Sequence, residues 1–123
     1  MYRRHLKHSR VKNLFKFVSA KMNTVFTVES ALEFDTCFHL EYSPAVKAFE
    51  AQPEGFYYTF EGRDCPYTPD FRVVDQQGNV SFIEVKPSDK VAKPDFLQRF
   101  PFKQQRAIEL SCPLKLITER QIR

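Results

Sequence analysis

Residues 67–87 read YTPDFRVVDQQGNVSFIEVKP and are the most informative part of the sequence. Two stretches rich in β-branched and aromatic residues, 70–74 and 80–86, flank the polar residues 75–79. Gly78 in this polar segment suits the left-handed backbone of a hairpin loop. The sequence therefore predicts two antiparallel strands joined by a short turn.

Three charged side chains share one face of this predicted hairpin. Glu84 and Lys86 lie two residues apart on a strand, so both project to the same side. Asp70 and Glu84 are each seven residues from Gln77, the centre of the loop. A symmetric hairpin would place these two acids opposite each other, with Cβ atoms about 4.5–5.5 Å apart.

Two like charges that face each other destabilise a sheet, whereas a divalent cation between them makes the arrangement favourable. Mg²⁺ uses few protein carboxylates and recruits phosphate oxygens, so the pair Asp70 and Glu84 suits it, with Mn²⁺ as the expected substitute. Lys86 beside such an ion can orient an attacking water or stabilise charge on phosphorus. The alternative interpretation of this Asp-x₁₃-Glu-x-Lys pattern is an ordinary hairpin with acids and a lysine facing solvent.

The remaining pattern predicts an α/β domain. We expect a first helix over Thr27–Leu40, capped by Thr27 or Ser30, and a second helix between Pro94 and Leu110. Between the helices we expect a strand over Val46–Gln52 and a hairpin of Phe56–Phe60 with Cys65–Tyr67. A last strand follows the second helix, over Leu114–Thr118. Pro101 either kinks the second helix or restarts it. A right-handed crossover after Glu84 makes the last strand parallel to the Glu84 strand. The predicted fold is a mixed central sheet flanked by helices.

A third acid is expected from the first helix. Glu33 is the candidate, but Ser30-Ala31-Leu32-Glu33 also matches a capping box, in which the glutamate caps a backbone amide. Glu29 lies one turn earlier on the same face and offers the same group. The local pattern leaves the catalytic and capping roles open.

Charge is distributed unevenly along the chain. Residues 1–22 hold seven basic side chains and no acid, whereas residues 23–123 carry a net charge of −3. We therefore divide the chain into a basic N-terminal arm (1–22) and one folded domain (23–123). Such an arm suits a polyphosphate such as DNA, and a solvated terminus is the alternative. The candidate DNA-binding residues are Arg3, Arg4, Lys7, Arg10, Lys12, Lys16 and Lys21.

Composition argues against several other classes. Three cysteines, Cys37, Cys65 and Cys112, are an odd number without CxxC spacing, which argues against a disulfide framework or a zinc site. A reducing cytoplasm is therefore the expected compartment. No apolar run approaches the length of a membrane span, so we expect no membrane association.

An ordered set of short motifs resembles the N-terminal nuclease domain of the TnsA transposon endonucleases, members of the PD-(D/E)-x-K superfamily with a restriction-endonuclease-like core. The resemblance runs from about Arg10 to the end of the chain. The motifs are Glu29–Glu33, Leu40–Val46, Gln52-Pro53, Tyr67–Phe71, Ile83–Pro87 and Ile117–Glu119.

The resemblance implies that Glu33, Asp70, Glu84 and Lys86 are the active-site residues, with Gln52 in a supporting role near the cleft. Some family members have glutamine at the position of Glu84. The resemblance also implies that the basic arm packs near DNA.

The activity implied is Mg²⁺-dependent nicking at the 5′ ends of a transposable element. The implied partners are a DDE transposase (TnsB-like) that cuts and joins the 3′ ends and an AAA+ regulator (TnsC-like). Many family members continue into a C-terminal helical domain that contacts partners, whereas this chain ends at Arg123. The rival interpretations are a restriction, repair or junction-resolving nuclease of the same superfamily, and a catalytically silent DNA-binding or assembly module.

Overall fold

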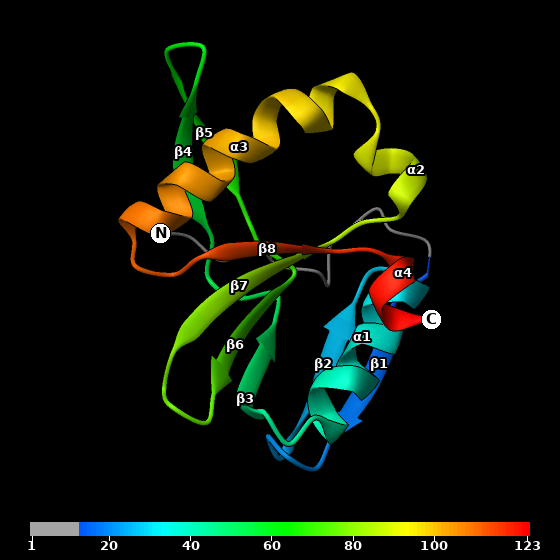
Figure 1. The fold of residues 1–123 in the computed structure, drawn as a ribbon. Helices are drawn as coiled ribbons and strands as arrows, with labels where there is room; N and C mark the ends of the chain where they lie inside the picture. The colour runs from blue at the N-terminus through cyan, green and yellow to red at the C-terminus, as the bar shows by residue number, and fades with distance from the viewer. Residues whose placement is uncertain (1–12) are drawn as a thin grey trace.

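A four-stranded mixed sheet forms the centre of the structure, a computed structural model that describes residues 13–123 (Figure 1). The strand order is β3 (Val46–Ala51), β6 (Phe71–Asp75), β7 (Val80–Val85) and β8 (Leu114–Ile117). β6 is antiparallel to both β3 and β7, and β8 is parallel to β7. The predicted α/β class with a mixed sheet and a parallel last strand is confirmed.

The hairpin of β6 and β7 has the register that the sequence predicts. Phe71 pairs with Ile83 and Val74 pairs with Val80, so the pairing is symmetric about the loop. Gly78 has a φ of 86°, in the left-handed region. Asp70 lies immediately before β6, and its N–H donates to the carbonyl of Ile83 over 2.9 Å. The register thus brings Asp70 level with the C-terminal end of β7.

The connection from β7 to β8 consists of two helices, α2 (Ser88–Val91) and α3 (Pro94–Glu109). The helix does not restart at Pro101, because α3 continues through it, and a kink there stays a prediction. Pro101 itself is exposed, whereas Phe96 and Phe100 before it and Ala107 after it are buried against the sheet. Burial on both sides of the proline holds α3 together at the missing backbone hydrogen bond.

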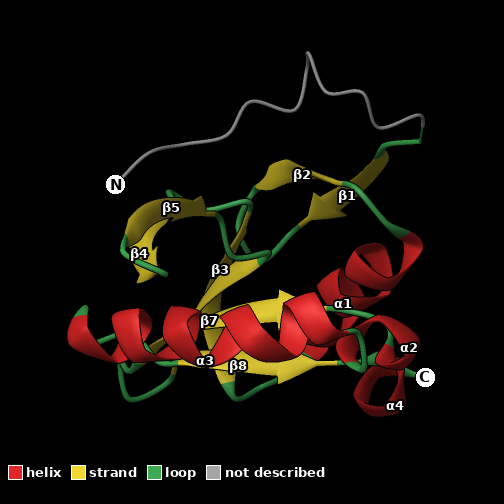
Figure 2. Cartoon of the chain, turned by 90° about the horizontal axis from the view of Figure 1, so that it is seen from above, coloured by secondary structure: helices red, strands yellow, loops and turns green. Residues whose placement is uncertain are grey.

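Two aromatic-rich cores cover the two faces of the sheet. On one face lie α1 (Ala31–Tyr42) and the hairpin of β1 (Phe15–Ser19) and β2 (Thr24–Val28). On the other face lie α3 and the expected hairpin, formed by β4 (Phe56–Phe60) and β5 (Arg63–Tyr67). Figure 2 shows α3 running along β7 and β8. The short helix α4 (Glu119–Ile122), capped by Thr118, follows β8.

The N-terminal part of the domain differs from the prediction. The first helix begins at Ala31 with Ser30 as its cap, whereas Thr27 belongs to β2. The expected helix start at Thr27 is therefore wrong, because the β-forming residues 24–28 pair with β1 instead. The β1–β2 hairpin also crosses the boundary that we placed after residue 22.

The basic residues assigned to the arm fall into three groups. Arg3, Arg4, Lys7, Arg10 and Lys12 lie outside the described residues. Lys16 is exposed on β1. The ammonium of Lys21 donates to the carbonyls of Leu40, Ser43 and Val46 over 2.9, 3.1 and 2.7 Å, so its contacts fix the connection from α1 to β3.

The three cysteines are free thiols, in agreement with the expected absence of a disulfide framework. Among residues 13–123, no helix has both the length and the apolar character needed to cross a membrane.

Candidate active site

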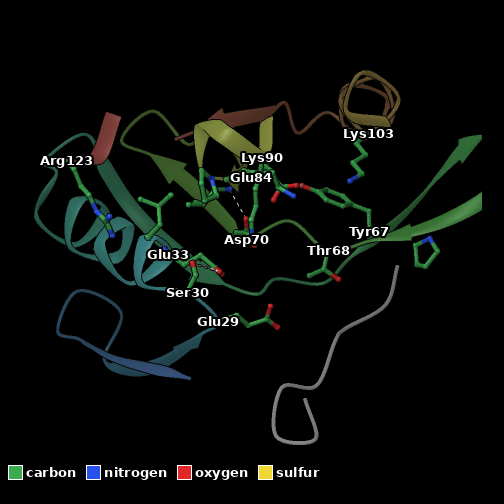
Figure 3. A pocket seen from close by; sticks show the side chains of 15 residues that line it. Glu29, Ser30, Glu33, Tyr67, Thr68, Asp70, Glu84, Lys90, Lys103 and Arg123 are labelled. Atoms are coloured by element: carbon green, nitrogen blue, oxygen red, sulfur yellow. Dashed lines mark hydrogen bonds between the residues drawn. The ribbon is translucent and has the colours of Figure 1, made fainter. Parts of the chain in front are cut away.

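A pocket of about 730 Å³ opens where the C-terminal end of β7 meets α1, α2 and α3. Its lining includes the four residues that the sequence singled out: Glu33, Asp70, Glu84 and Lys86. Figure 3 shows Glu33, Asp70 and Glu84 approaching this space from α1, from the start of β6 and from β7. The structure therefore brings side chains from distant parts of the chain to one place.

Asp70 and Glu84 form the centre of the pocket. The Val85 N–H donates to Asp70 Oδ2 over 2.7 Å, which fixes that carboxyl group against the end of β7. Burial, the nearby charges of Glu84 and Glu33, and a side-chain hydrogen bond with Glu84 together raise the pKa of Asp70 well above its usual range. The Val85 N–H opposes this shift only in part. Burial and repulsion between the two acids therefore disfavour two negative charges here unless a cation binds.

Glu84 is buried and is held by a residue that the sequence reasoning missed. The hydroxyl of Tyr67, at the end of β5, donates to Glu84 Oε1 over 2.9 Å. Tyr67 was part of a recognised motif, but nothing in the local pattern indicated a contact with a residue 17 positions away. This hydrogen bond orients Glu84 within the pocket.

Lys86 lines the same pocket, just beyond the end of β7. Its ammonium lies 5.0 Å from the centroid of the Phe96 ring on α3. A cation over an aromatic face is stabilised without a negative partner, which leaves ammonium hydrogens available for a ligand in the pocket.

Glu33 lies both at the N-terminal cap of α1 and on the pocket. Its N–H donates to Ser30 Oγ over 3.1 Å, and Ser30 Oγ donates to Glu33 Oε2 over 2.9 Å, so Ser30 caps α1 as expected for the N-terminal residue. Glu33 is nevertheless buried and lines the pocket. Glu29 lines it as well, but is not buried.

Gln52 connects the α1 side of the pocket to Asp70. Its side-chain amide donates to Glu33 Oε1 over 3.2 Å, and its backbone N–H donates to the carbonyl of Asp70 over 2.9 Å. Gln52 is buried and has a φ of 50°, a left-handed conformation that is uncommon for residues other than glycine. Backbone strain of this kind is tolerated where surrounding contacts fix a functional geometry.

The donor set fits a cation with few protein ligands. Within residues 13–123, no three Asp, Glu, His or Cys side chains form a group that could hold a metal ion by themselves. The two carboxylates of Asp70 and Glu84 match Mg²⁺, which commonly uses one or two carboxylates and completes its shell with water and phosphate oxygens. Glu33 as a third ligand stays a prediction, since both of its oxygens already accept hydrogen bonds.

Further cations on the pocket were not predicted from the sequence. Lys90, Lys103 and Arg123 line it together with Lys86. Acids at the centre and cations around them suit a ligand that carries phosphate groups and is bound together with a metal ion. Lys103 comes from α3, and no short-range pattern connects it with Asp70.

The mixed sheet and its flanking helices are consistent with the restriction-endonuclease-like fold. Residues 43–119 match the family described as TnsA-like endonuclease N terminal. The chain therefore belongs to the TnsA-like endonucleases, and the match indicates a nuclease of transposition. The matched range includes Gln52, Asp70, Glu84 and Lys86 but not Glu33. The sequence matches no curated protein.

Proposed function

We propose that this protein is a Mg²⁺-dependent DNA endonuclease that nicks the 5′ ends of a transposable element. It acts in this proposal as the TnsA-like subunit of a heteromeric transposase. The observation that carries the proposal is the pair of facing carboxylates, Asp70 and Glu84, with Lys86 beside them in one pocket.

Each residue has a defined task in this proposal. Asp70 and Glu84 would hold Mg²⁺, which when bound supplies a Lewis acid for the scissile phosphate and lowers the pKa of a coordinated water. Tyr67 keeps Glu84 in position through its 2.9 Å hydrogen bond. Lys86 orients the water that attacks phosphorus or stabilises the negative charge that develops there. Glu33 closes the α1 side and helps to place the metal or the water.

The reaction that these groups support is hydrolysis of a phosphodiester, leaving a 5′-phosphate and a 3′-hydroxyl. Family membership supports DNA as the substrate and a transposition system as the context. The partners that we propose are a DDE transposase, which acts on the 3′ ends, and an AAA+ ATPase that regulates both.

The proposal is tested by nicking of supercoiled plasmid DNA that carries the ends of the element. With the DDE transposase present, we expect wild-type protein to convert the plasmid to the open-circular form with Mg²⁺ or Mn²⁺, and not with EDTA. Asp70→Ala and Lys86→Ala should abolish the nick. Lys115→Ala, an exposed lysine on β8, is the matched control and should cut at the wild-type rate. Equal nicking by wild type and Asp70→Ala would reject the assignment.

The same plasmids separate the two rival functions. A restriction, repair or junction-resolving nuclease would cut plasmids with and without the element ends at equal rates. A silent DNA-binding module would give no metal-dependent nick with the DDE transposase present, although it would bind the DNA.

A further inference from the structure

Lys103 lies on the face of α3 that points toward the β4–β5 hairpin, and its side chain is half-buried. Its ammonium is 4.4 Å from the centroid of the Tyr67 ring and 5.7 Å from that of Tyr58. Within the described part of the chain, it makes no ion pair with a carboxylate and no hydrogen bond to a side chain or carbonyl. Among residues 13–123, its close partners are the faces of the Tyr67 and Tyr58 rings.

In this arrangement the Lys103 ammonium keeps N–H donors available for a ligand. An ammonium carries three N–H donors, and a ring face satisfies the charge from one side without accepting a strong hydrogen bond. Burial lowers the pKa of Lys103, while the charge of Glu84 partly opposes this shift. Lys103 is therefore a partly desolvated cation that gains from an anion in the pocket.

Its position relative to the acids is defined by Tyr67. The ring of Tyr67 supports the Lys103 ammonium, and the hydroxyl of the same residue donates to Glu84. Figure 3 shows Lys103 reaching toward Tyr67 from α3 on the side of the pocket away from Glu33. An anion on Lys103 would thus lie next to whatever Asp70 and Glu84 bind.

Arg99, one helical turn earlier, shows the contrasting case. Its guanidinium lies 4.5 Å from the Phe60 centroid, but it also forms a 3.0 Å ion pair with Asp95 and a 3.2 Å hydrogen bond to the Tyr58 hydroxyl. Arg99 is already engaged by a carboxylate and does not line the pocket. Lys103 does line it and has neither partner.

We propose that Lys103 binds a backbone phosphate of the DNA strand that occupies the pocket, next to the phosphate held at Asp70 and Glu84. This inference rests on the proposed function. It adds a strand-positioning contact from α3 that is separate from the basic N-terminal residues and from Lys86.

The test uses the slope of DNA affinity against salt concentration, measured by fluorescence anisotropy with a labelled duplex that carries the element end. All variants carry Asp70→Asn so that the probe stays intact. Lys103→Met keeps the apolar stem on Tyr67 and removes the charge. We expect it to reduce the slope of log K against log salt by about 0.9, the value for one lost phosphate contact, and to weaken binding about tenfold at about 50 mM salt.

Two further variants control for folding and for general charge. Lys103→Arg keeps the charge and should retain the parent slope. Lys115→Met removes a charge from β8, where Lys115 pairs with Ile83 and so projects from the opposite face of the sheet to Glu84. It should leave the slope unchanged, and thermal melting should give the same transition temperature for it and the parent.

If Lys103→Met and its parent have equal slopes of log K against log salt, the phosphate contact of Lys103 is rejected. The nuclease proposal is then unaffected, because it rests on the nicking result. A reduced slope together with an absence of metal-dependent nicking would retain the phosphate contact and reject the nuclease proposal. If the parent does not bind the duplex even at low salt, both proposals fail.

Discussion

The two walls of the pocket hold carboxylates under opposite electrostatic conditions. On the α1 wall, Glu33 accepts hydrogen bonds from two neutral donors, Ser30 and Gln52. On the sheet wall, Asp70 and Glu84 face each other, and burial and mutual repulsion raise the pKa of Asp70. All three carboxylates accept hydrogen bonds from neutral donors, but Asp70 and Glu84 also face each other directly.

This difference indicates where a cation belongs. Glu33 accepts hydrogen bonds on both of its oxygens, so it serves the fold whether or not metal is bound. Two facing carboxylates need either a shared proton or a cation. Binding of Mg²⁺ replaces the proton, and we therefore expect function to depend most on the sheet wall.

The largest expected effect is on the nicking rate, when one acid of either wall is neutralised in a separate variant. Asp70→Asn should lower the nicking rate at least about a hundredfold, because it removes a direct metal ligand. Glu33→Gln should lower it only about tenfold, as expected for a residue that supports the ligands. Initial rates on the same plasmid measure both, and an equal loss for the two variants would mean that the walls share one role.

The second prediction concerns pH and the stability of the metal-free protein. Asp70 has a raised pKa in the folded state, so the folded protein binds this proton more tightly than the unfolded chain, whose aspartates titrate near about 3.9. Stability therefore falls as pH rises from that value through the folded pKa, by up to about 1.4 kcal/mol per pH unit.

Urea unfolding in EDTA across about pH 5–8 measures this loss. Glu41 and Glu119 have lowered pKa values and act in the opposite direction, but only as pH falls below their unfolded pKa of about 4.3. Asp70→Asn should remove the decline above pH 5. A wild-type protein whose stability rises over the same range would contradict the raised pKa.

The smallest expected effect is on the α1 wall alone. Ser30→Ala removes the cap of α1 and one hydrogen bond to Glu33, and should cost about 1 kcal/mol of unfolding free energy. Nicking should fall no more than a few-fold, since Asp70 and Glu84 keep their positions. Denaturant unfolding checks the stability, and an unchanged midpoint would show that Ser30 contributes nothing to the helix.

Much of the sheet wall could be predicted from the sequence because its geometry is local. A side-chain period of two places Glu84 and Lys86 on one face, and the short turn at Gly78 sets the register that brings Asp70 opposite. The α1 wall was harder to predict, because Glu33 matches a capping pattern and also lines the pocket. Only the tertiary structure shows that Glu33 lies both at the cap of α1 and on the pocket.

Two features could not be predicted from the sequence: a long-range contact, and a strand whose basic residues were assigned to an arm. Tyr67 and Lys103 meet from β5 and α3, 36 positions apart, through packing that no local period encodes. The β1 strand was missed because its basic residues suggested an arm. The sequence does alternate at Phe15-Lys16-Phe17, a pattern that indicates a strand covering a core, and in the structure Lys16 is exposed and Phe17 is buried.

The central claim is that Asp70 and Glu84 together bind a hard divalent cation. Titration calorimetry of the metal-free protein with Mg²⁺, run on the wild type, Asp70→Asn and Glu33→Gln, tests it most directly. We predict one binding event for the wild type, its loss in Asp70→Asn, and weaker but retained binding in Glu33→Gln. Equal Mg²⁺ binding by the wild type and Asp70→Asn would contradict the account.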